Sequence, residues 1–517
     1  MADASRVSNG VRDTVLAMGL AAVPLMLHLL TNTQYGYFRD EFYYIACSAH
    51  LDFGYVDHPP LSILMLAVER WLLGDSLSAI RFLPAVAGAL LVLLTAAITR
   101  ALGGGRFAQG LAALAVVVAP FYLAVGNFFS MNVLEPLFWM MAAYLLVRIV
   151  NTGNSRLWLA FGVVAGLGLE NKHSMLLFGC GVLVALLLTP QRKYLRDGWL
   201  WLGAVTAALL FLPNILWEAG LGWPTLEFMH NAQTYKIAPM SPVELLVQQI
   251  LMLQPLTLPL WLAGIWYYLF SRHGQRYRLC GWIYVVVLAV CILQRTKAYY
   301  LAPIYPLLLA AGAIVFERLT QRSDRGWLRP ACISALAIGG IITAPLALPV
   351  LPADTLVRYA RFLHLGESAK GATSETAKLG ELPQYFADMF GWEDVVEAVA
   401  RAYESLPVEE RRKAAIYVGN YGEAGAIDVL GKARHLPPAI SGHNNYWLWG
   451  PGDYSGEVVI VLGGPSQDLE SLFEKVERVG TVRCGYCMPF ENDRSVYVCR
   501  GLKRPLKEIW PQLKHYV

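Results

Sequence analysis

Charged side chains are scarce in this chain: Asp, Glu, Lys and Arg make up 15% of its 517 residues, whereas 56% are hydrophobic. Soluble domains carry roughly 25% charged residues, so the composition excludes a wholly soluble protein. Most of the chain must face lipid or other apolar helices. The net charge of +4 is small and the basic residues are scattered. Membrane topology explains them better than nucleic acid does, so no nucleic-acid partner is expected.

Repeats of fixed period, low-complexity segments and a signal-peptide cleavage site are also missing from the sequence. Without a small-residue cleavage site, the apolar run near residues 15–30 is expected to form a retained helix. Transporters tend to show inverted repeats and polar sites at the bilayer midplane. The missing repeat therefore argues against a transporter, although a transporter or a lipid-linked-sugar flippase is kept as the alternative function.

Cysteine is sparse, with eight residues, and only Cys484, Cys487 and Cys499 lie close together. A zinc site at these three would lack its fourth ligand. In an oxidising compartment, one disulfide with one spare thiol is the better interpretation. The sequence does not tell which pair forms.

Apolar runs of roughly 17–25 residues each predict a spanning helix. We count about eleven, at residues 13–31, 77–99, 107–126, 132–150, 157–170, 173–189, 198–217, 246–270, 279–294, 299–316 and 328–349. Two of these runs are short by themselves. Together they cover residues 157–189, which is too long for one ordinary crossing at 1.5 Å per residue.

Basic residues mark alternate connections between these runs. They are Arg6 and Arg12; Arg100 and Arg106; Arg148 and Arg156; Arg192, Lys193 and Arg196; Arg272, Arg276 and Arg278; Arg318, Arg322, Arg325 and Arg329. The positive-inside rule places these connections in the cytoplasm. The N-terminus is then inside a multi-pass protein of the cell (inner) membrane. The loops at 32–76 and 218–244, the turn at 295–299 and the C-terminal segment are expected outside.

Hydropathy falls after about residue 351. Residues 392–406 have helical spacing, and short apolar or alternating runs predict strands at 414–418, 458–462, 479–484 and 495–499. The expected fold is therefore a polytopic α-helical membrane protein, residues 1–350, with an extracytoplasmic α/β domain at 351–517.

The first outer loop is unusually acidic. Arg39, Asp40 and Glu41 open a predicted surface helix at 40–51, whose apolar face, including Phe42, would lie on the membrane. Paired carboxylates are expensive near lipid, so a function is expected of them. Neighbouring helical residues point in different directions, so one carboxylate can face a substrate while the other orients a partner group. The alternative is that they are helix caps and dipole partners.

An Asp57-His58-Pro59-Pro60 sequence follows in the same loop and predicts a rigid turn before a second surface helix at 61–73. His58 could offer a cation or a hydrogen-bond donor to a phosphate. The alternative is a purely structural turn.

Polar residues also stand at the predicted outer ends of later spans. Asn132 and Glu135 lie at the mouth of the fourth, where a glutamate needs a partner, a metal or a water-filled cavity. Four cations lie on outer connections: Lys172, His173, Arg295 and Lys297. They either form a basic set for a substrate or snorkel to lipid headgroups.

Carboxylates and cations that meet at an outer membrane surface suit a phospholipid-linked sugar. Its leaving phosphate departs as an anion, so it needs cations or a metal rather than a general acid. The acceptor hydroxyl is a poor nucleophile and needs a carboxylate as base. Glycoside hydrolases, in contrast, need an acid as well as a base.

Three motifs carry a family resemblance: Arg-Asp-Glu-x-Tyr-Tyr at 39–44, the turn at 57–60, and Lys-Ala-Tyr-Tyr-Leu-Ala-Pro-Ile-Tyr-Pro at 297–306. Together they resemble family 39 glycosyltransferases of the GT-C superfamily. That group includes protein O-mannosyltransferases and bacterial enzymes that add aminoarabinose or galacturonic acid to lipopolysaccharide. The resemblance covers about residues 14–350. It implies an inverting transferase with a polyprenyl-phosphate sugar donor, a lipid, glycan or protein acceptor, and Asp40 as catalytic aspartate.

Residue roles follow from the motifs and the resemblance together. The expected catalytic residues are Asp40, Glu41 and Glu135. The expected substrate-binding residues are Arg39, Asp57, His58, Asn132, Lys172, His173, Arg295, Lys297 and Tyr299. His58 stands where aminoarabinose transferases tend to carry lysine, and Glu135 where many relatives carry aspartate, so the donor headgroup and a divalent metal both stay open.

Two further interpretations fit the sequence less well. An exported binding domain on a membrane anchor would not need eleven spans. The glycines at 419–425 lack the spacing of a dinucleotide loop, and an exported domain would meet no NAD. The segments 420–425 and 441–447 resemble the tails of uncharacterised bacterial family members, which implies no activity.

Overall fold

The computed structural model describes residues 2–321, 323–364 and 376–517. The chain forms two compact units, each built from three segments. The helical unit consists of Met1–Asn32, Ser78–Leu216 and Pro239–Val350. The sheet unit consists of Thr33–Leu77, Trp217–Ala238 and Leu351–Val517, so the acidic first loop belongs to the same unit as the C-terminal domain.

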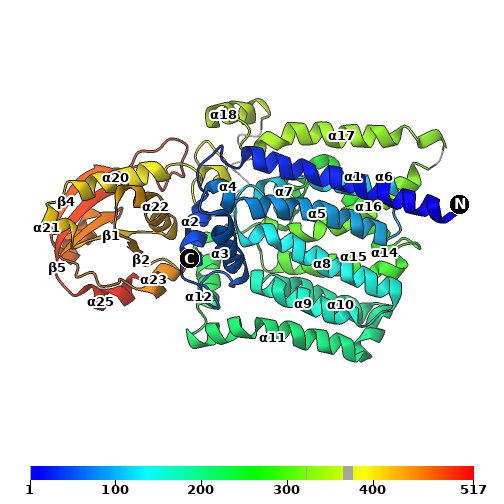
Figure 1. The fold of residues 1–517 in the computed structure, drawn as a ribbon, viewed down its shortest axis with the longest axis horizontal. Helices are drawn as coiled ribbons and strands as arrows, with labels where there is room; N and C mark the ends of the chain where they lie inside the picture. The colour runs from blue at the N-terminus through cyan, green and yellow to red at the C-terminus, as the bar shows by residue number, and fades with distance from the viewer. Residues whose placement is uncertain (1, 322, 365–375) are drawn as a thin grey trace. The chain divides into compact units, whose positions relative to one another are not determined.

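Long apolar helices make up the helical unit, and several lie side by side (Figure 1). Among the described residues, seven helices are long and apolar enough to cross a membrane: Val11–Thr31, Leu77–Ala101, Met131–Thr152, Gly198–Gly220, Gln275–Leu293, Ala298–Leu319 and Leu328–Leu346. The predicted polytopic helical fold is confirmed.

The following helices lie wholly or partly in this unit: α1 (Ala2–Thr31), α4 (Leu77–Ile80), α5 (Phe82–Ala101), α6 (Arg106–Val117), α7 (Pro120–Val125), α8 (Met131–Thr152), α9 (Leu157–Asn171), α10 (Met175–Leu188), α11 (Gly198–Gly220), α13 (Pro242–Met252), α14 (Leu258–Leu269), α15 (Arg278–Leu293), η5 (Ala298–Ile304), α16 (Tyr305–Leu319) and α17 (Leu328–Thr343).

Several of the eleven predicted spans differ from the structure. The run predicted as one helix at 246–270 is two, Pro242–Met252 and Pro255–Leu269, bent by 98° at Gln254. Pro255 cannot donate a backbone hydrogen bond, and Gln254 has φ 71°, outside the helical region. A bend of 109° likewise follows α10. The described residues thus hold seven spans, or nine if each bent pair is one, with α6 and α9 shorter.

Glycines allow close helix packing in this unit. A Cβ atom on Gly264 of α14 would lie 2.1 Å from the carbonyl oxygen of Leu308, and one on Gly312 of α16 would lie 1.9 Å from that of Leu260. Because no side chain fits there, both glycines permit the backbones of α14 and α16 to touch. Small residues of this kind are typical of helix contacts within membranes.

A five-stranded sheet with the order β2-β1-β3-β5-β4 forms the core of the sheet unit. Its strands are β1 (Ala414–Val418), β2 (Ala439–Ser441), β3 (Val458–Leu462), β4 (Phe473–Thr481) and β5 (Ser495–Leu502). β1 runs parallel to β2 and β3, whereas β5 is antiparallel to β3 and β4. The expected C-terminal α/β fold is confirmed.

The helices of the sheet unit are α2 (Arg39–Ala49), α3 (Leu61–Leu73), α12 (Pro224–Asn231), α18 (Ala353–Phe362), α19 (Gln384–Ala387), α20 (Trp392–Glu404), α21 (Val408–Arg411), α22 (Tyr421–Leu430), α23 (Asn445–Trp449), α24 (Ser466–Leu472) and α25 (Leu506–Ile509). Figure 1 shows α20 and α22 beside the sheet. The helix α2 of the first loop packs directly on α22.

Candidate active site

The start of α2 separates the two neighbouring carboxylates of the acidic loop. Glu41 is fully buried, and its Oε2 accepts a hydrogen bond from the backbone N–H of Phe38 at 2.8 Å. This contact is the helix cap that the sequence offered as an alternative. Asp40 keeps 31% of its side chain exposed. Asp40 is therefore the carboxylate that a substrate can reach, and a catalytic role for Glu41 stays a prediction.

Asp40 has two polar neighbours. The hydroxyl of Tyr421, the first residue of α22, donates a hydrogen bond of 2.8 Å to its Oδ1. The guanidinium of Arg39 lies 3.8 Å from the same oxygen and 4.0 Å from Asp388. A residue of the C-terminal domain thus contacts the predicted catalytic carboxylate.

The apolar face of α2 is covered by protein, not by lipid as the sequence predicts. Phe42 is fully buried and packs edge-on against Trp392, with ring centroids 5.6 Å apart. A Cβ atom on Gly425 would lie 2.7 Å from the Cβ of Phe42, and one on Gly422 would lie 2.4 Å from the Cγ of Arg39. Because both positions are glycine, α22 can lie against α2 and cover this face.

Tyr43, one turn along α2, contacts two oxygen acceptors. Its hydroxyl lies 2.9 Å from Oδ1 of Asp57 and 2.9 Å from Oδ1 of Asn445. The N–H of Val56 also donates to the Asn445 oxygen, at 2.8 Å, which fixes the orientation of this amide. Because the Tyr43 hydroxyl has a single proton, it can donate to only one of these two acceptors at a time. Burial raises the pKa of Asp57, so this carboxyl is easier to protonate than an exposed aspartate.

The His58 ring is enclosed by aromatic side chains. Its centroid lies 4.7 Å from that of Tyr44 and 4.9 Å from that of Tyr55, and it is fully buried. Burial lowers the pKa of His58, which makes it a neutral ring at neutral pH. Of the two possibilities that the sequence offers here, a cation or a hydrogen-bond donor, this burial favours the neutral donor, because desolvation outweighs the nearby charge of Asp57.

The helical unit holds a second group of predicted site residues. Glu135 of α8 is buried, and its Oε2 lies 2.6 Å from Nζ of Lys172, at the end of α9. Lys172 also donates to Oδ1 of Asn132 at 2.8 Å, and Ser174 donates to Oε1 of Glu135. The partner that Glu135 was expected to need is thus Lys172. Buried charges in proteins are paired in this way.

Two aromatic rings complete this group. The ammonium of Lys172 lies 5.0 Å from the ring centroid of Tyr299 and 4.6 Å from that of Tyr300, within the range of a cation–π contact. His173 points elsewhere, with Nε2 3.4 Å from the Asn214 side chain. The other two predicted cations are placed near the start of η5, where Arg295 is exposed and Lys297 is half-buried.

Sequence reasoning missed Tyr421, Asn445, Asp388, Ser174 and Tyr300. For Tyr421 a partial signal exists, because Asn420 and Glu423 form a capping box that marks the start of a helix. Nothing in the local sequence shows that this helix lies on α2. Within the described ranges, no cluster of three or more His, Cys, Asp or Glu side chains could hold a metal ion.

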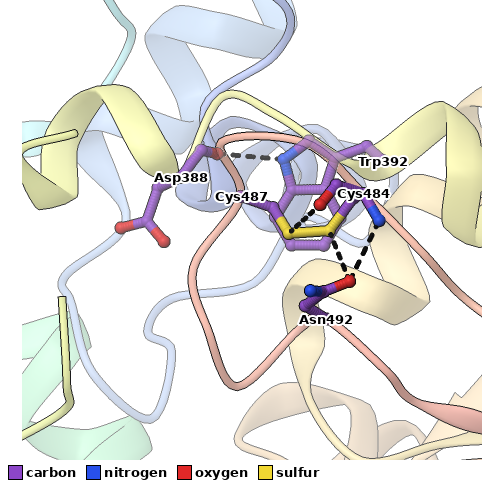
Figure 2. The surroundings of a disulfide bond; sticks show 5 residues. All are labelled: Asp388, Trp392, Cys484, Cys487 and Asn492. Carbon is purple, nitrogen blue, oxygen red and sulfur yellow. Dashed lines mark hydrogen bonds between the residues drawn. A yellow bond between two sulfur atoms is a disulfide. The ribbon is translucent and has the colours of Figure 1, made fainter. Parts of the chain in front are cut away.

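A disulfide joins Cys484 to Cys487, and Cys499 is a buried free thiol. Figure 2 shows Asn492 accepting a hydrogen bond of 3.0 Å from the Cys484 N–H, and Trp392 donating to the Asp388 carbonyl at 2.9 Å. The same Asp388 carbonyl accepts the N–H of Arg39 at 3.0 Å. The disulfide loop therefore lies beside the segment that contacts the start of α2.

Comparisons with known proteins agree with this geometry. Residues 57–217 match a family described as dolichyl-phosphate-mannose-protein mannosyltransferase. This stretch contains Asp57, His58, Asn132, Glu135, Lys172 and His173, but neither Asp40 nor the C-terminal domain. No curated protein matches the chain by sequence.

Solved structures match over most of the chain. ArnT from Cupriavidus metallidurans in the apo state has 14% sequence identity and a TM-score of 0.60, with 93% of this chain and 97% of that chain covered. The same protein bound to undecaprenyl phosphate has 14% identity, the same coverage and a TM-score of 0.61. The Archaeoglobus fulgidus oligosaccharyltransferase with a tethered acceptor peptide has 12% identity and a TM-score of 0.51, covering 83% and 64%. These structures confirm the expected fold, which is like that of ArnT, and the family match includes one of the three motifs, the turn at 57–60.

Proposed function

We propose that this chain is an inverting glycosyltransferase that moves a sugar from a polyprenyl-phosphate donor to a hydroxyl group of a lipid, glycan or protein acceptor. One observation carries the proposal: Asp40, in a GT-C fold, is a partly exposed carboxylate held by one hydrogen bond at the start of α2. The ArnT structure bound to undecaprenyl phosphate shows that this fold accommodates a polyprenyl phosphate in a relative.

Asp40 acts as the general base. Its Oδ1 accepts the Tyr421 hydroxyl, and Oδ2 takes the proton of the acceptor hydroxyl as the acceptor oxygen attacks the anomeric carbon. The bond from that carbon to the phosphate oxygen breaks at the same time, so the configuration inverts. The phosphate leaves as an anion and needs no proton, only positive charge to stabilise it.

Within the helical unit, Lys172 is a predicted substrate-binding cation that fixed partners hold in place. Its ammonium has three hydrogens, of which two go to Glu135 and Asn132. In this proposal, the third goes to a phosphate oxygen of the donor. Glu135 holds the ammonium in place, and the rings of Tyr299 and Tyr300 contact it.

The sheet unit is built from three segments that are all expected outside the membrane, and this supports chemistry at the outer face. Its three segments, Thr33–Leu77, Trp217–Ala238 and Leu351–Val517, fold into one compact body. Segments of one folded body lie on one side of a membrane. The positive-inside rule assigns each of these segments independently to the outer side.

An Asp40→Asn variant tests the proposal. We expect transfer from a polyprenyl-phosphate sugar to fall about 10²–10⁴-fold, as for loss of a general base, while the protein still inserts in the membrane. Mass spectrometry compares lipopolysaccharide, glycoproteins and polyprenyl-phosphate sugars from a deletion strain complemented with each variant.

The matched control is Asp52→Asn, which changes an exposed carboxylate of the same loop whose Oδ1 accepts the backbone N–H of Phe53. It should restore the wild-type glycan. Restoration by Asp40→Asn as well would remove Asp40 from the role of base. A deletion strain that keeps every glycan but accumulates lipid-linked sugar on one leaflet would instead favour the flippase.

A further inference from the structure

The C-terminal domain contributes a tyrosine to the neighbourhood of Asp40. The Tyr421 hydroxyl lies 2.8 Å from Oδ1 of Asp40. Its ring is stacked between Tyr43, with centroids 4.5 Å apart, and His443, with centroids 4.6 Å apart. The backbone N–H of Tyr421 donates to Nδ1 of His443 at 3.2 Å. Ring and backbone are therefore both fixed, and the hydroxyl is held at one position.

Packing of α22 on α2 determines where this hydroxyl lies. The capping box of Asn420 and Glu423 starts the helix at Tyr421, because the Asn420 side chain accepts the Glu423 N–H at 3.0 Å. Gly422 and Gly425 then leave no side chain between the two helices. Any larger residue at these positions would move α22 away and carry Tyr421 with it.

The direction of the hydrogen bond follows from the burial of the tyrosine. Tyr421 is buried, and this raises its pKa well above the ordinary value, so the phenol keeps its proton at neutral pH. It can only donate to the carboxylate and cannot compete with it as a base. A donor to the ionised form of a carboxylate favours that form.

Other charged or titratable groups also surround Asp40. The groups near Asp40 or near its direct neighbours lie on α2, on the turn that follows, on the segment 217–238 and on the C-terminal domain. They are Arg39, Asp57, His58, Lys236, Asp388 and His443. Burial lowers the pKa values of His58 and His443, so both are neutral near pH 7. Arg39 is always charged and is shared with Asp388. Around neutral pH, the proton on Tyr421 is the donor aimed directly at Asp40.

We propose that Tyr421 is a positioning residue, which orients the Asp40 carboxylate through its hydroxyl, so that the C-terminal domain is part of the active site. This inference rests on the proposed function, in which Asp40 is the base. It gives the C-terminal segment a role that its resemblance to uncharacterised tails did not supply.

A Tyr421→Phe variant isolates the hydroxyl, because phenylalanine keeps the ring between Tyr43 and His443. Without this donor, Oδ1 of Asp40 loses the hydrogen bond that holds it. A carboxylate that loses a donor is easier to protonate. The acid limb of the kcat profile should move up by roughly one pH unit, which corresponds to a tenfold loss of activity on that limb. The KM for the donor should stay unchanged. An unmoved acid limb would overturn the proposal.

The matched control is Tyr446→Phe. The buried Tyr446 hydroxyl also donates to an aspartate of the same domain, Asp428, at 2.7 Å. Its loss should lower thermal stability about as much as Tyr421→Phe does. It should leave the pH profile unchanged. A similar pH shift in both variants would mean that the effect is merely structural, and would also overturn the proposal.

A second readout separates this inference from the proposed function. The purified protein is coupled to a small amine with a water-soluble carbodiimide at several pH values, and labelling of Asp40 is measured by peptide mass spectrometry against Asp52. Labelling of Asp40 relative to Asp52 should rise in Tyr421→Phe, because Oδ1 of Asp40 loses the hydroxyl that occupies it. If it rises while wild type transfers no sugar, Tyr421 still orients Asp40 and only the proposed function fails. If it stays while wild type is active, only the inference fails.

Discussion

At the scale of single residues, Asp40 of the sheet unit and Glu135 of the helical unit are both predicted catalytic carboxylates, but their surroundings suit them to different tasks. Both oxygens of Glu135 are engaged, one by Lys172 and the other by Ser174, and the side chain is buried. Asp40 has one oxygen held by Tyr421 and is 31% exposed. A base must reach its substrate, so Asp40 fits proton transfer and Glu135 fits the holding of a cation.

The sequence predicts the residue types of the site better than their roles. Arg39, Asp40 and Glu41 attract attention because they are charged beside a membrane helix. Asp40 and Glu41 are adjacent in the sequence, so their spacing does not tell which one caps α2 and which one stays accessible. The geometry of the first helical turn decides this. His58 shows the same limit, because its neutral state comes from three tyrosine rings whose packing around it is tertiary.

The pair of Lys172 and Glu135 gives a prediction at this scale. Lys172→Met should destabilise the protein by about 3–5 kcal/mol, because it leaves Glu135 as a buried charge without its cation. Adding Glu135→Gln should recover most of this stability. If Lys172 binds the donor phosphate, the double variant should still need a 10- to 100-fold higher donor concentration, in line with a lost charge-assisted contact of roughly 1.5–3 kcal/mol.

Thermal melting in detergent and initial rates at varied donor concentration measure the two effects separately. The KM for the acceptor provides the control and should change little. A double variant with wild-type donor dependence would make Lys172 a purely structural partner of Glu135, and the phosphate site would have to be sought elsewhere.

At the scale of elements, local patterns identify α3, β1 and β3 with the residues that the structure shows. They fail where an element has no local signature. β4 begins at Phe473 rather than near 479, because it is an edge strand whose exposed residues hide any apolar alternation. The contact of α2 with α22 joins segments about 380 residues apart. The hydrophobic periodicity of either segment does not predict this contact.

The glycines of α22 predict how this contact responds to substitution. In Gly425→Ala, the new Cβ would lie 2.7 Å from the Cβ of Phe42 and 2.8 Å from its carbonyl carbon. The α2 backbone cannot yield as a flexible side chain can, so α22 must shift. We expect a loss of roughly 1–3 kcal/mol in stability, as for overpacking, and a larger loss of transfer because Tyr421 moves from Asp40.

Gly485→Ala is the matched control, since a Cβ there meets nothing within 4 Å. Melting temperature and transfer rate compare the two variants. If Gly425→Ala behaved like Gly485→Ala in both, close packing of α22 on α2 would not be needed for activity.

At the scale of the whole molecule, three segments far apart in the sequence make up the sheet unit. The sequence assigns each of them to the outer side by charge alone, without any information on their contacts. It predicts too many straight spans, because hydropathy does not register the bends at Gln254 and after α10. The assignment of sides does not depend on those bends, provided that each bent pair crosses the membrane once.

Epitope tags test the sides directly. Tags after Arg192 and after Arg272, both exposed positions in basic connections, should be protected from antibody or protease in intact spheroplasts. Tags after Leu221, which is 49% exposed, and after Val517 should be accessible, because both positions belong to the sheet unit. Permeabilised spheroplasts control for tags that are merely buried. An accessible tag after Arg192 would contradict the prediction that the basic connections at both ends of residues 157–189 lie in the cytoplasm. Opposite results at Leu221 and Val517 would contradict the sheet unit itself, since one folded body cannot lie on both sides of a bilayer.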